Sequence, residues 1–194
     1  MVMYIMGRQK TMHLRAAMLL LVLFSSTLSG CTGGGDDEEV LTAFPEFSAL
    51  ADDNRTYTRA SMLGQPYFVV FSAEWCDAPC HSTMHAIWGQ IPNATVLVFS
   101  TDPDPDPQGI SLSDWHLKAD QFDDERDGAV ITDHGVNLTT YAFMKGPDAA
   151  AALGISRPGS VAVVNPVGEI VYLHEGRLDD PSTIDDKWAL AMEA

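Results

Sequence analysis

Three continuous apolar runs along the chain predict the strands of a central sheet. They cover Tyr67 to Phe71, Ala94 to Phe99 and Ser160 to Val164. A run without polar alternation is typical of a strand that is covered on both faces. Between the first two runs, apolar side chains recur at helical spacing at Cys80, Met84, Ile87, Trp88 and Ile91. This strand, helix, strand order predicts a parallel pair of strands joined by a right-handed crossover.

Shorter segments predict further elements around this unit. The segment Phe44 to Ala51 is expected to be a short amphipathic helix or a loop. Helical segments are expected at Ser113 to Phe122, Leu138 to Lys145, Asp148 to Leu153 and Ser182 to Met192. Further strands are expected at Thr56 to Thr58, Ala129 to Ile131 and Glu169 to His174. The last of these follows Asn165-Pro166-Val167-Gly168, which is a hairpin signal after Ser160 to Val164.

The N-terminal residues have the pattern of an export signal. Basic residues precede an apolar run from Ala16 to Phe24, and Leu28-Ser29-Gly30-Cys31 follows it. A run of about nine residues is too short for a membrane span, which needs roughly 20. The segment resembles a bacterial lipobox, so we expect a signal peptide over residues 1–30 and a lipid on Cys31. The alternative is an uncleaved N-terminal anchor helix, and both place the rest of the chain outside the cytoplasm at the membrane surface.

Charge and composition divide the remainder into a tether and one domain. Residues 31–194 hold eight basic and 27 acidic residues, a formal charge of −19. Nucleic acid is therefore excluded as a partner, because cations that neutralise phosphates drive its binding. Residues 31–43 are rich in glycine and acid and predict a flexible tether. Residues 44–194 are enough for one domain with a substantial core.

The strand that ends at Phe71 leads into the strongest motif of the chain. The motif is Phe71-Ser72-Ala73-Glu74-Trp75-Cys76-Asp77-Ala78-Pro79-Cys80. Its first part resembles the active-site approach of the thioredoxin family, in which a tryptophan precedes the first of two reactive cysteines. Thioredoxins have two residues between these cysteines, whereas three separate Cys76 from Cys80. That C-x3-C spacing resembles the Sco copper chaperones and related thiol reductases.

The order of the elements extends this resemblance over residues 44–192. It is similar to the thioredoxin-like fold in its extracytoplasmic lipoprotein form, the TlpA or redoxin type. The implied architecture is α/β, a central mixed sheet with helices on both faces, an N-terminal extension and an insertion after the second core strand. The resemblance also implies a cis-proline before the strand that begins at Ser160, facing the dithiol. Pro158 in Arg157-Pro158-Gly159 is the residue expected in that role.

The resemblance implies dithiol–disulfide exchange at Cys76 and Cys80. A thiolate in the first helical turn is stabilised by backbone N–H groups and the helix dipole, which lower its pKa from about 8.5. We expect Cys76 to attack the substrate and Cys80 to resolve the mixed disulfide. Asp77 disfavours the Cys76 thiolate, whereas His81 favours it when protonated. The buried carboxylate that thioredoxins carry six residues before the first cysteine is replaced by Val70.

Copper handling of the Sco type is the main alternative. Its candidate ligands are Cys76, Cys80, His81 and His85, since sulfur and imidazole suit Cu(I). The histidine that Sco proteins place before the penultimate strand is absent, and Arg157-Pro158-Gly159 stands there. A peroxiredoxin-like peroxidase is a lesser alternative, because the threonine expected ahead of its attacking cysteine is missing.

The sequence therefore predicts a membrane-tethered extracytoplasmic thiol–disulfide oxidoreductase. Its site residues are Cys76, Cys80, Trp75 and Pro158. It needs no cofactor in this interpretation, and copper in the alternative. Its expected partners are protein thiols and disulfides, together with the membrane through its anchor, and the protein is expected to be a monomer.

Overall fold

A six-stranded mixed sheet forms the centre of the domain. The computed structural model describes residues 42–122 and 136–193. The strands run in the order β1 (Thr42–Ala43), β8 (Glu169–His174), β7 (Ser160–Val164), β4 (Tyr67–Ser72), β5 (Thr95–Ser100) and β6 (Ala142–Lys145). Strands β4, β5 and β6 are parallel, whereas β7, β8 and β1 follow in antiparallel pairs. The carboxyl ends of the three parallel strands therefore lie at one edge of the sheet.

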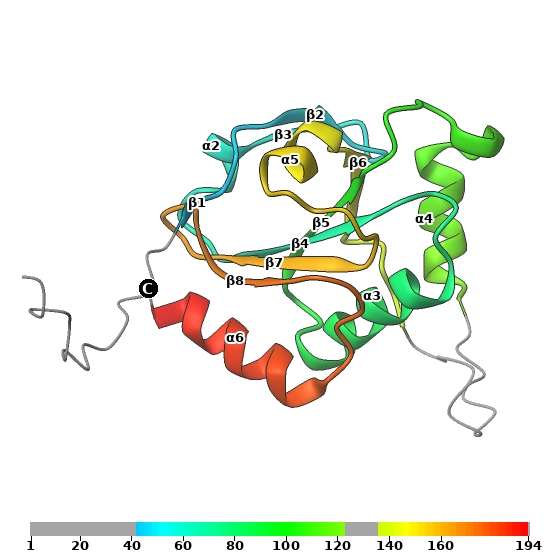
Figure 1. Ribbon diagram of the computed structural model, residues 1–194. Coiled ribbons are helices and arrows are strands. Elements are labelled where there is room, and N and C mark those ends of the chain that lie inside the picture. The colour runs from blue at the N-terminus through cyan, green and yellow to red at the C-terminus, as the bar shows by residue number, and fades with distance from the viewer. Residues whose placement is uncertain (1–41, 123–135, 194) are drawn as a thin grey trace, which may run out of the picture. The chain divides into compact units, whose positions relative to one another are not determined.

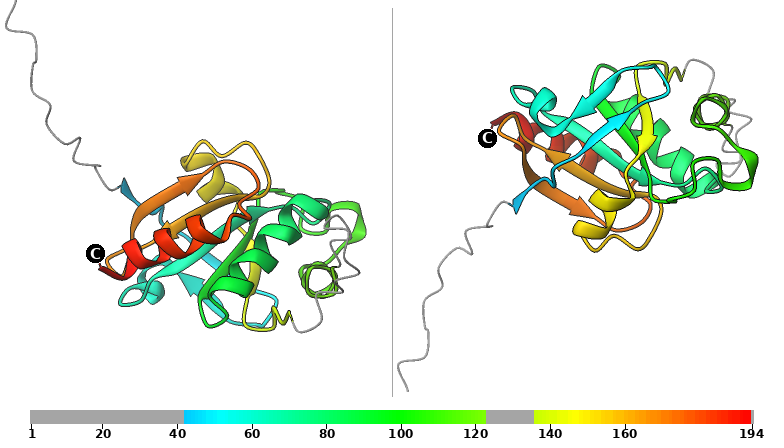
Figure 2. Two further views of the ribbon diagram at one scale, coloured as in Figure 1. Left: turned by 90° about the horizontal axis from the view of Figure 1, so that it is seen from below. Right: turned by 90° about the horizontal axis from the view of Figure 1, so that it is seen from above.

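Helices cover both faces of this sheet (Figures 1 and 2). On one face lie α3 (Ala78–Gln90), which connects β4 to β5, and α6 (Pro181–Glu193). The other face carries α5 (Pro147–Ala152), α2 (Arg59–Met62) and the separate two-stranded sheet of β2 (Ser48–Leu50) and β3 (Thr56–Thr58). The described part of the insertion after β5 contains a 3-10 turn, η1 (Pro107–Gly109), and α4 (Leu112–Asp120), which packs beside β6.

The central strands are buried on both faces, as their apolar runs predict. Every residue of β4 is buried. Its alternate side chains enter two separate cores. Phe68 and Val70 pack toward α3 and α6. On the opposite face, Tyr67, Val69 and Phe71 pack toward α5 and the segment that begins at Phe44. In the second core, Phe44 lies against Tyr67, Phe71 and Phe99. Because side chains of β4 belong to both cores, the strand is held on both faces. It therefore fixes the position of the cysteine motif that follows it.

Helix α4 is fixed to the domain by polar contacts of His116. Its Nδ1 lies 2.6 Å from the Asp52 carboxylate, its Nε2 lies 2.9 Å from the Leu138 carbonyl oxygen, and its ring stacks on Phe143. The second Asp52 oxygen accepts the backbone N–H of Phe143 at 2.9 Å. The insertion is therefore held to the turn between β2 and β3 and to the segment around β6.

The structure confirms the thioredoxin-like α/β fold and corrects two predicted elements. Residues 142–145 form strand β6, not the end of a helical piece from Leu138, because they pair with β5. The segment Phe44 to Ala51 contains β2 in place of the expected amphipathic helix or loop, since Ser48–Leu50 pairs with β3. Thr42 and Ala43, expected at the end of the tether, pair with β8. The strand expected at Ala129 to Ile131 lies outside the described residues.

Candidate redox site

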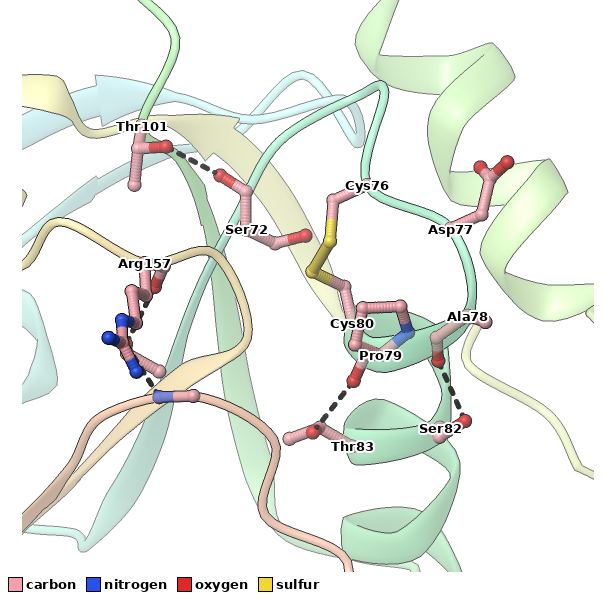
Figure 3. Close-up of a disulfide and its surroundings, with 12 residues drawn as sticks. Ser72, Cys76, Asp77, Ala78, Pro79, Cys80, Ser82, Thr83, Thr101 and Arg157 are labelled. Carbon is pink, nitrogen blue, oxygen red and sulfur yellow. Dashed lines mark hydrogen bonds between the residues drawn. A yellow bond between two sulfur atoms is a disulfide. The ribbon is translucent and has the colours of Figure 1, made fainter.

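The two cysteines lie where β4 passes into α3 (Figure 3). After β4 ends at Ser72, the backbone N–H of Cys76 donates to the carbonyl oxygen of Ala73 at 2.9 Å, which closes a tight turn. Asp77 is the N-cap of α3, and its carbonyl oxygen accepts the backbone N–H of Cys80 at 3.1 Å. Cys76 therefore immediately precedes the N-cap, two residues before the helix begins, while Cys80 belongs to the first turn.

A disulfide joins Cys76 to Cys80, with their Cα atoms 6.0 Å apart. The two residues differ in burial: Cys76 is 7% exposed and Cys80 is fully buried. Both pack with Ala73 in a small apolar cluster. Of the two cysteines, only Cys76 thus presents surface to an incoming group.

Trp75 stands exposed beside the disulfide and is fixed by one hydrogen bond. Its side chain is 46% exposed, and its indole N–H donates to the Asp102 carboxylate at 3.1 Å. The pKa of Asp102 is lowered, first by the backbone N–H of Asp104 and then by the indole. Asp102 therefore stays ionised over the neutral range. Trp75, one of the predicted site residues, forms part of the surface next to Cys76.

The effects that Asp77 and His81 are expected to have on the Cys76 thiolate are both reduced in the structure. Asp77 forms an ion pair with Lys118 of α4, which partly compensates its negative charge. Burial lowers the pKa of His81 to about 4, an effect that exceeds the opposing one of Asp77. His81 is therefore neutral at pH 7 and supplies no positive charge to the thiolate.

The prediction of a cis peptide bond at Pro158 is wrong. No cis peptide bond occurs among residues 42–122 and 136–193. The segment Arg157 to Ser160 makes a turn with proline second and with Gly159, at φ 95°, third. This arrangement fits a type II turn, which uses a trans proline. The backbone N–H of Gly159 donates to the carbonyl oxygen of Phe71 at 2.7 Å, so the turn does lie against the end of β4. Figure 3 shows Arg157 on this neighbouring loop.

Sequence reasoning missed a buried carboxylate in the motif itself. Val70, at the expected carboxylate position, is a core residue, whereas Glu74 is fully buried and forms an ion pair with Lys145. The hydroxyl of Ser100 donates to the second Glu74 oxygen at 2.6 Å. One signal was available, namely an acid directly after a buried strand. The sequence does not indicate Lys145 as the partner of this acid, because the pattern around Lys145 predicts a helical piece and not strand β6.

The candidate copper ligands do not converge in the described part of the chain. Among those residues, no group of three or more histidine, cysteine or acidic side chains is placed to hold a metal ion. His81 and His85 both face the ring of Phe122, and the His85 Nε2 lies 2.7 Å from the Ala119 carbonyl oxygen. Within the same residues, neither ring nitrogen of His81 has a hydrogen-bond partner.

Comparisons with known proteins support the fold. No protein-family model matches the sequence, and no curated protein matches it significantly. The thio-disulfide isomerase of Thermus thermophilus superposes with a TM-score of 0.56 and 19% identity, over 78% of this chain and 95% of that one. For the exposed lipoprotein thioredoxin Etrx1 of Streptococcus pneumoniae the TM-score is 0.53 and the identity 15%, over 75% and 99% of the two chains.

A third similar structure comes from the Sco family. BsSco, a member of that family of cytochrome c oxidase assembly proteins, has a TM-score of 0.52 and 12% identity, over 80% of this chain and 96% of that one. Identities this low establish a shared fold and nothing finer. The chain therefore has a thioredoxin-like fold that carries a C-x3-C disulfide where β4 meets α3.

Proposed function

We propose that this protein is a membrane-tethered, extracytoplasmic thiol–disulfide oxidoreductase that acts through Cys76 and Cys80. The observation that carries the proposal is the disulfide itself, formed between a slightly exposed and a fully buried cysteine at the start of α3. An exposed and hydrogen-bonded Trp75 beside it offers a surface on which a substrate chain rests. A thio-disulfide isomerase and a lipoprotein thioredoxin have similar folds, which supports the proposal.

The proposed exchange transfers two electrons between this pair and a protein substrate. In the reducing direction, the Cys76 thiolate attacks one sulfur of a substrate disulfide and expels the other as a thiolate, which then takes up a proton. The Cys80 thiol loses its proton to solvent and attacks the Cys76 sulfur. The second substrate sulfur leaves as a thiolate, and the Cys76–Cys80 disulfide remains. The same steps in reverse oxidise a substrate dithiol.

The location rests on the N-terminal pattern. Residues 1–41 lie outside the described part of the structure, so the lipobox-like segment and Cys31 remain a proposal from sequence. Among the described residues, no helix has the length and hydropathy needed to cross a bilayer. An exported domain agrees with the disulfide, because disulfides persist in oxidising compartments and are rare in the cytosol.

Copper delivery of the Sco type is the second candidate function. The C-x3-C spacing and the likeness to BsSco favour it. A Cu(I) ion would need the reduced Cys76 and Cys80 as ligands, with an imidazole added. His81 is the nearest imidazole along the chain, but its ring lies against Phe122.

A trapping experiment tests the oxidoreductase proposal. In the full-length protein, Cys80→Ser should accumulate mixed disulfides with protein substrates, because the resolving thiol is gone, whereas Cys76→Ser should form none and lose reductase activity. Limited alkylation of the reduced protein should modify Cys76 first. Faster alkylation of Cys80, or trapping by Cys76→Ser, would reverse the assigned roles. Failure of both variants to trap, with wild-type protein inactive toward disulfides, would reject the function.

A further inference from the structure

The carboxyl ends of the three parallel strands bring together residues that thiol exchange as described does not use. Ser72, Ser100 and Lys145 are register neighbours across β4, β5 and β6. Glu74 lies two residues after Ser72, in the turn that leads to Cys76. The carboxyl edge of parallel strands is where α/β proteins place their functional groups. This edge therefore brings together Glu74, within the turn before Cys76, and Lys145, at the end of β6.

Glu74 is bound to both neighbouring strands. Its side chain is fully buried, one oxygen pairs with the Lys145 ammonium, and the other accepts the Ser100 hydroxyl at 2.6 Å. Lys145 is 25% exposed, so the pair lies between the interior and solvent. A charge is rarely buried fully unless it is paired, because the loss of hydration is costly. Each member of this pair thus depends on the other.

The same network reaches the outer side of the turn. The Lys145 ammonium also donates to the Asp102 carbonyl oxygen at 3.3 Å, and the Asp102 carboxylate holds the indole of Trp75. Glu74 and Trp75 are the two middle residues of the turn that the hydrogen bond from Cys76 to Ala73 closes. Glu74 is therefore fastened to the ends of β5 and β6, and Trp75 to the loop that follows β5.

We propose that Glu74 and Lys145 are a positioning pair that fixes the turn before Cys76 and sets the thiol–disulfide equilibrium of the Cys76–Cys80 pair. The inference deepens the proposed function, on which its biological meaning rests. Intact, the pair places balanced charge at the turn that leads to Cys76. Reduction creates thiolate character at Cys76, so a change in that balance acts on the reduced form and not on the neutral disulfide.

The two halves of the pair have opposite effects. Glu74→Gln keeps the size and the hydrogen bond with Ser100 but leaves the Lys145 ammonium without its anion, which favours the thiolate and makes the disulfide easier to reduce. Lys145→Met keeps the apolar stem but leaves the Glu74 carboxylate without its cation, which disfavours the thiolate. The double variant restores neutrality. A pair that served folding alone would not shift the equilibrium in opposite directions.

The test measures the equilibrium of the full-length protein with glutathione at pH 7. We expect Glu74→Gln to change the equilibrium constant at least tenfold toward the reduced form, about 30 mV for two electrons. Lys145→Met should change it in the opposite direction, with Lys145→Gln as its replacement if the methionine variant does not fold. Glu74→Gln combined with Lys145→Met should return within about threefold of wild type, and Lys145→Arg should stay there.

A matched control uses another partly buried acid–base contact, between Asp52 and His116. Asp52→Asn removes the carboxylate that faces His116 and should lower the stability of the domain without moving the glutathione equilibrium. Unchanged equilibria in both single variants, or shifts in the same direction, would overturn the proposal. The readout needs no protein substrate. A domain that shows these shifts yet exchanges with no protein disulfide would contradict the proposed function and leave this inference standing.

Discussion

Trp75 donates its indole N–H to the carboxylate of Asp102, 27 residues further along the chain, at 3.1 Å. The bond joins the redox turn to the acidic loop that follows β5, and it holds an exposed ring immediately before Cys76. A large side chain that is both exposed and fixed provides contact area at little cost in conformational entropy when a partner binds. Trp75 therefore serves as a preorganised part of the proposed substrate surface.

Loss of this bond should slow exchange with protein substrates. We expect Asp102→Ala to lower the rate of protein disulfide reduction several-fold, because the ring is released, and to affect a small disulfide such as oxidised glutathione much less. Asp106→Ala is the control, as it removes the same charge from the same loop but leaves the hydrogen bond between Asp102 and Trp75 in place. Equal losses in both variants would show that loop charge, and not the orientation of Trp75, matters.

His81 should make the domain less stable as the pH falls. Its pKa is about 4 in the folded protein and about 6.5 when unfolded, so the folded state binds fewer protons between these values. As the pH falls from 6.5 toward 4, the free energy of unfolding should therefore decrease. The contribution of His81 to this decrease is on the order of 3 kcal/mol. His81→Leu should flatten the dependence, as measured by urea unfolding across this range. Identical pH profiles for both proteins would refute the assignment.

Two glycines should respond in opposite ways to alanine. A Cβ at Gly146 would lie 2.2 Å from Cδ2 of Phe99, within the core beside β6. Gly146→Ala should therefore destabilise the protein by about 1–3 kcal/mol through overpacking. Gly89, in α3, has open space around a Cβ, and Gly89→Ala should stabilise the protein by about 0.5–1 kcal/mol through helix propensity. Thermal unfolding of the two variants checks both signs.

The lipid anchor proposed at Cys31 predicts a change of fraction. Cys31→Ala should move the protein from the membrane to the soluble or secreted fraction, because the acyl chains are lost. Mass spectrometry of the membrane-bound wild type should find an N-terminus at Cys31. An intact Met1 on the membrane-bound protein would instead establish the uncleaved anchor.

The buried strands and the redox helix could be predicted because their signals are local. Tyr67 to Phe71 is uninterrupted and apolar, and both faces of β4 are indeed covered. In the hairpin turn before Glu169, Gly168 has a φ of 84°, which lies in the left-handed region that glycine adopts without steric cost. In these segments, propensity, turn chemistry and burial all agree.

The short strands could not be predicted, because their pairing is long-range. Ala142–Lys145 has only four residues, and its side chains enter both cores, so it shows no period of two. It becomes a strand through β5, more than 40 residues earlier. The contact between Glu74 and Lys145 is not predictable for the same reason, because it too joins residues far apart in the sequence. In the sequence alone, each of them is an isolated charge. At Pro158 the resemblance implies the cis form, whereas the structure has a trans turn with Gly159 at φ 95°.

The most direct test of the central claim is a redox titration of Cys76 and Cys80 in the full-length protein, repeated with Cu(I). The account predicts one reversible two-electron couple that disappears in Cys76→Ser, together with weak copper binding at most. A single tightly bound copper ion that is lost in Cys76→Ser, or a disulfide that no physiological thiol buffer reduces, would contradict it.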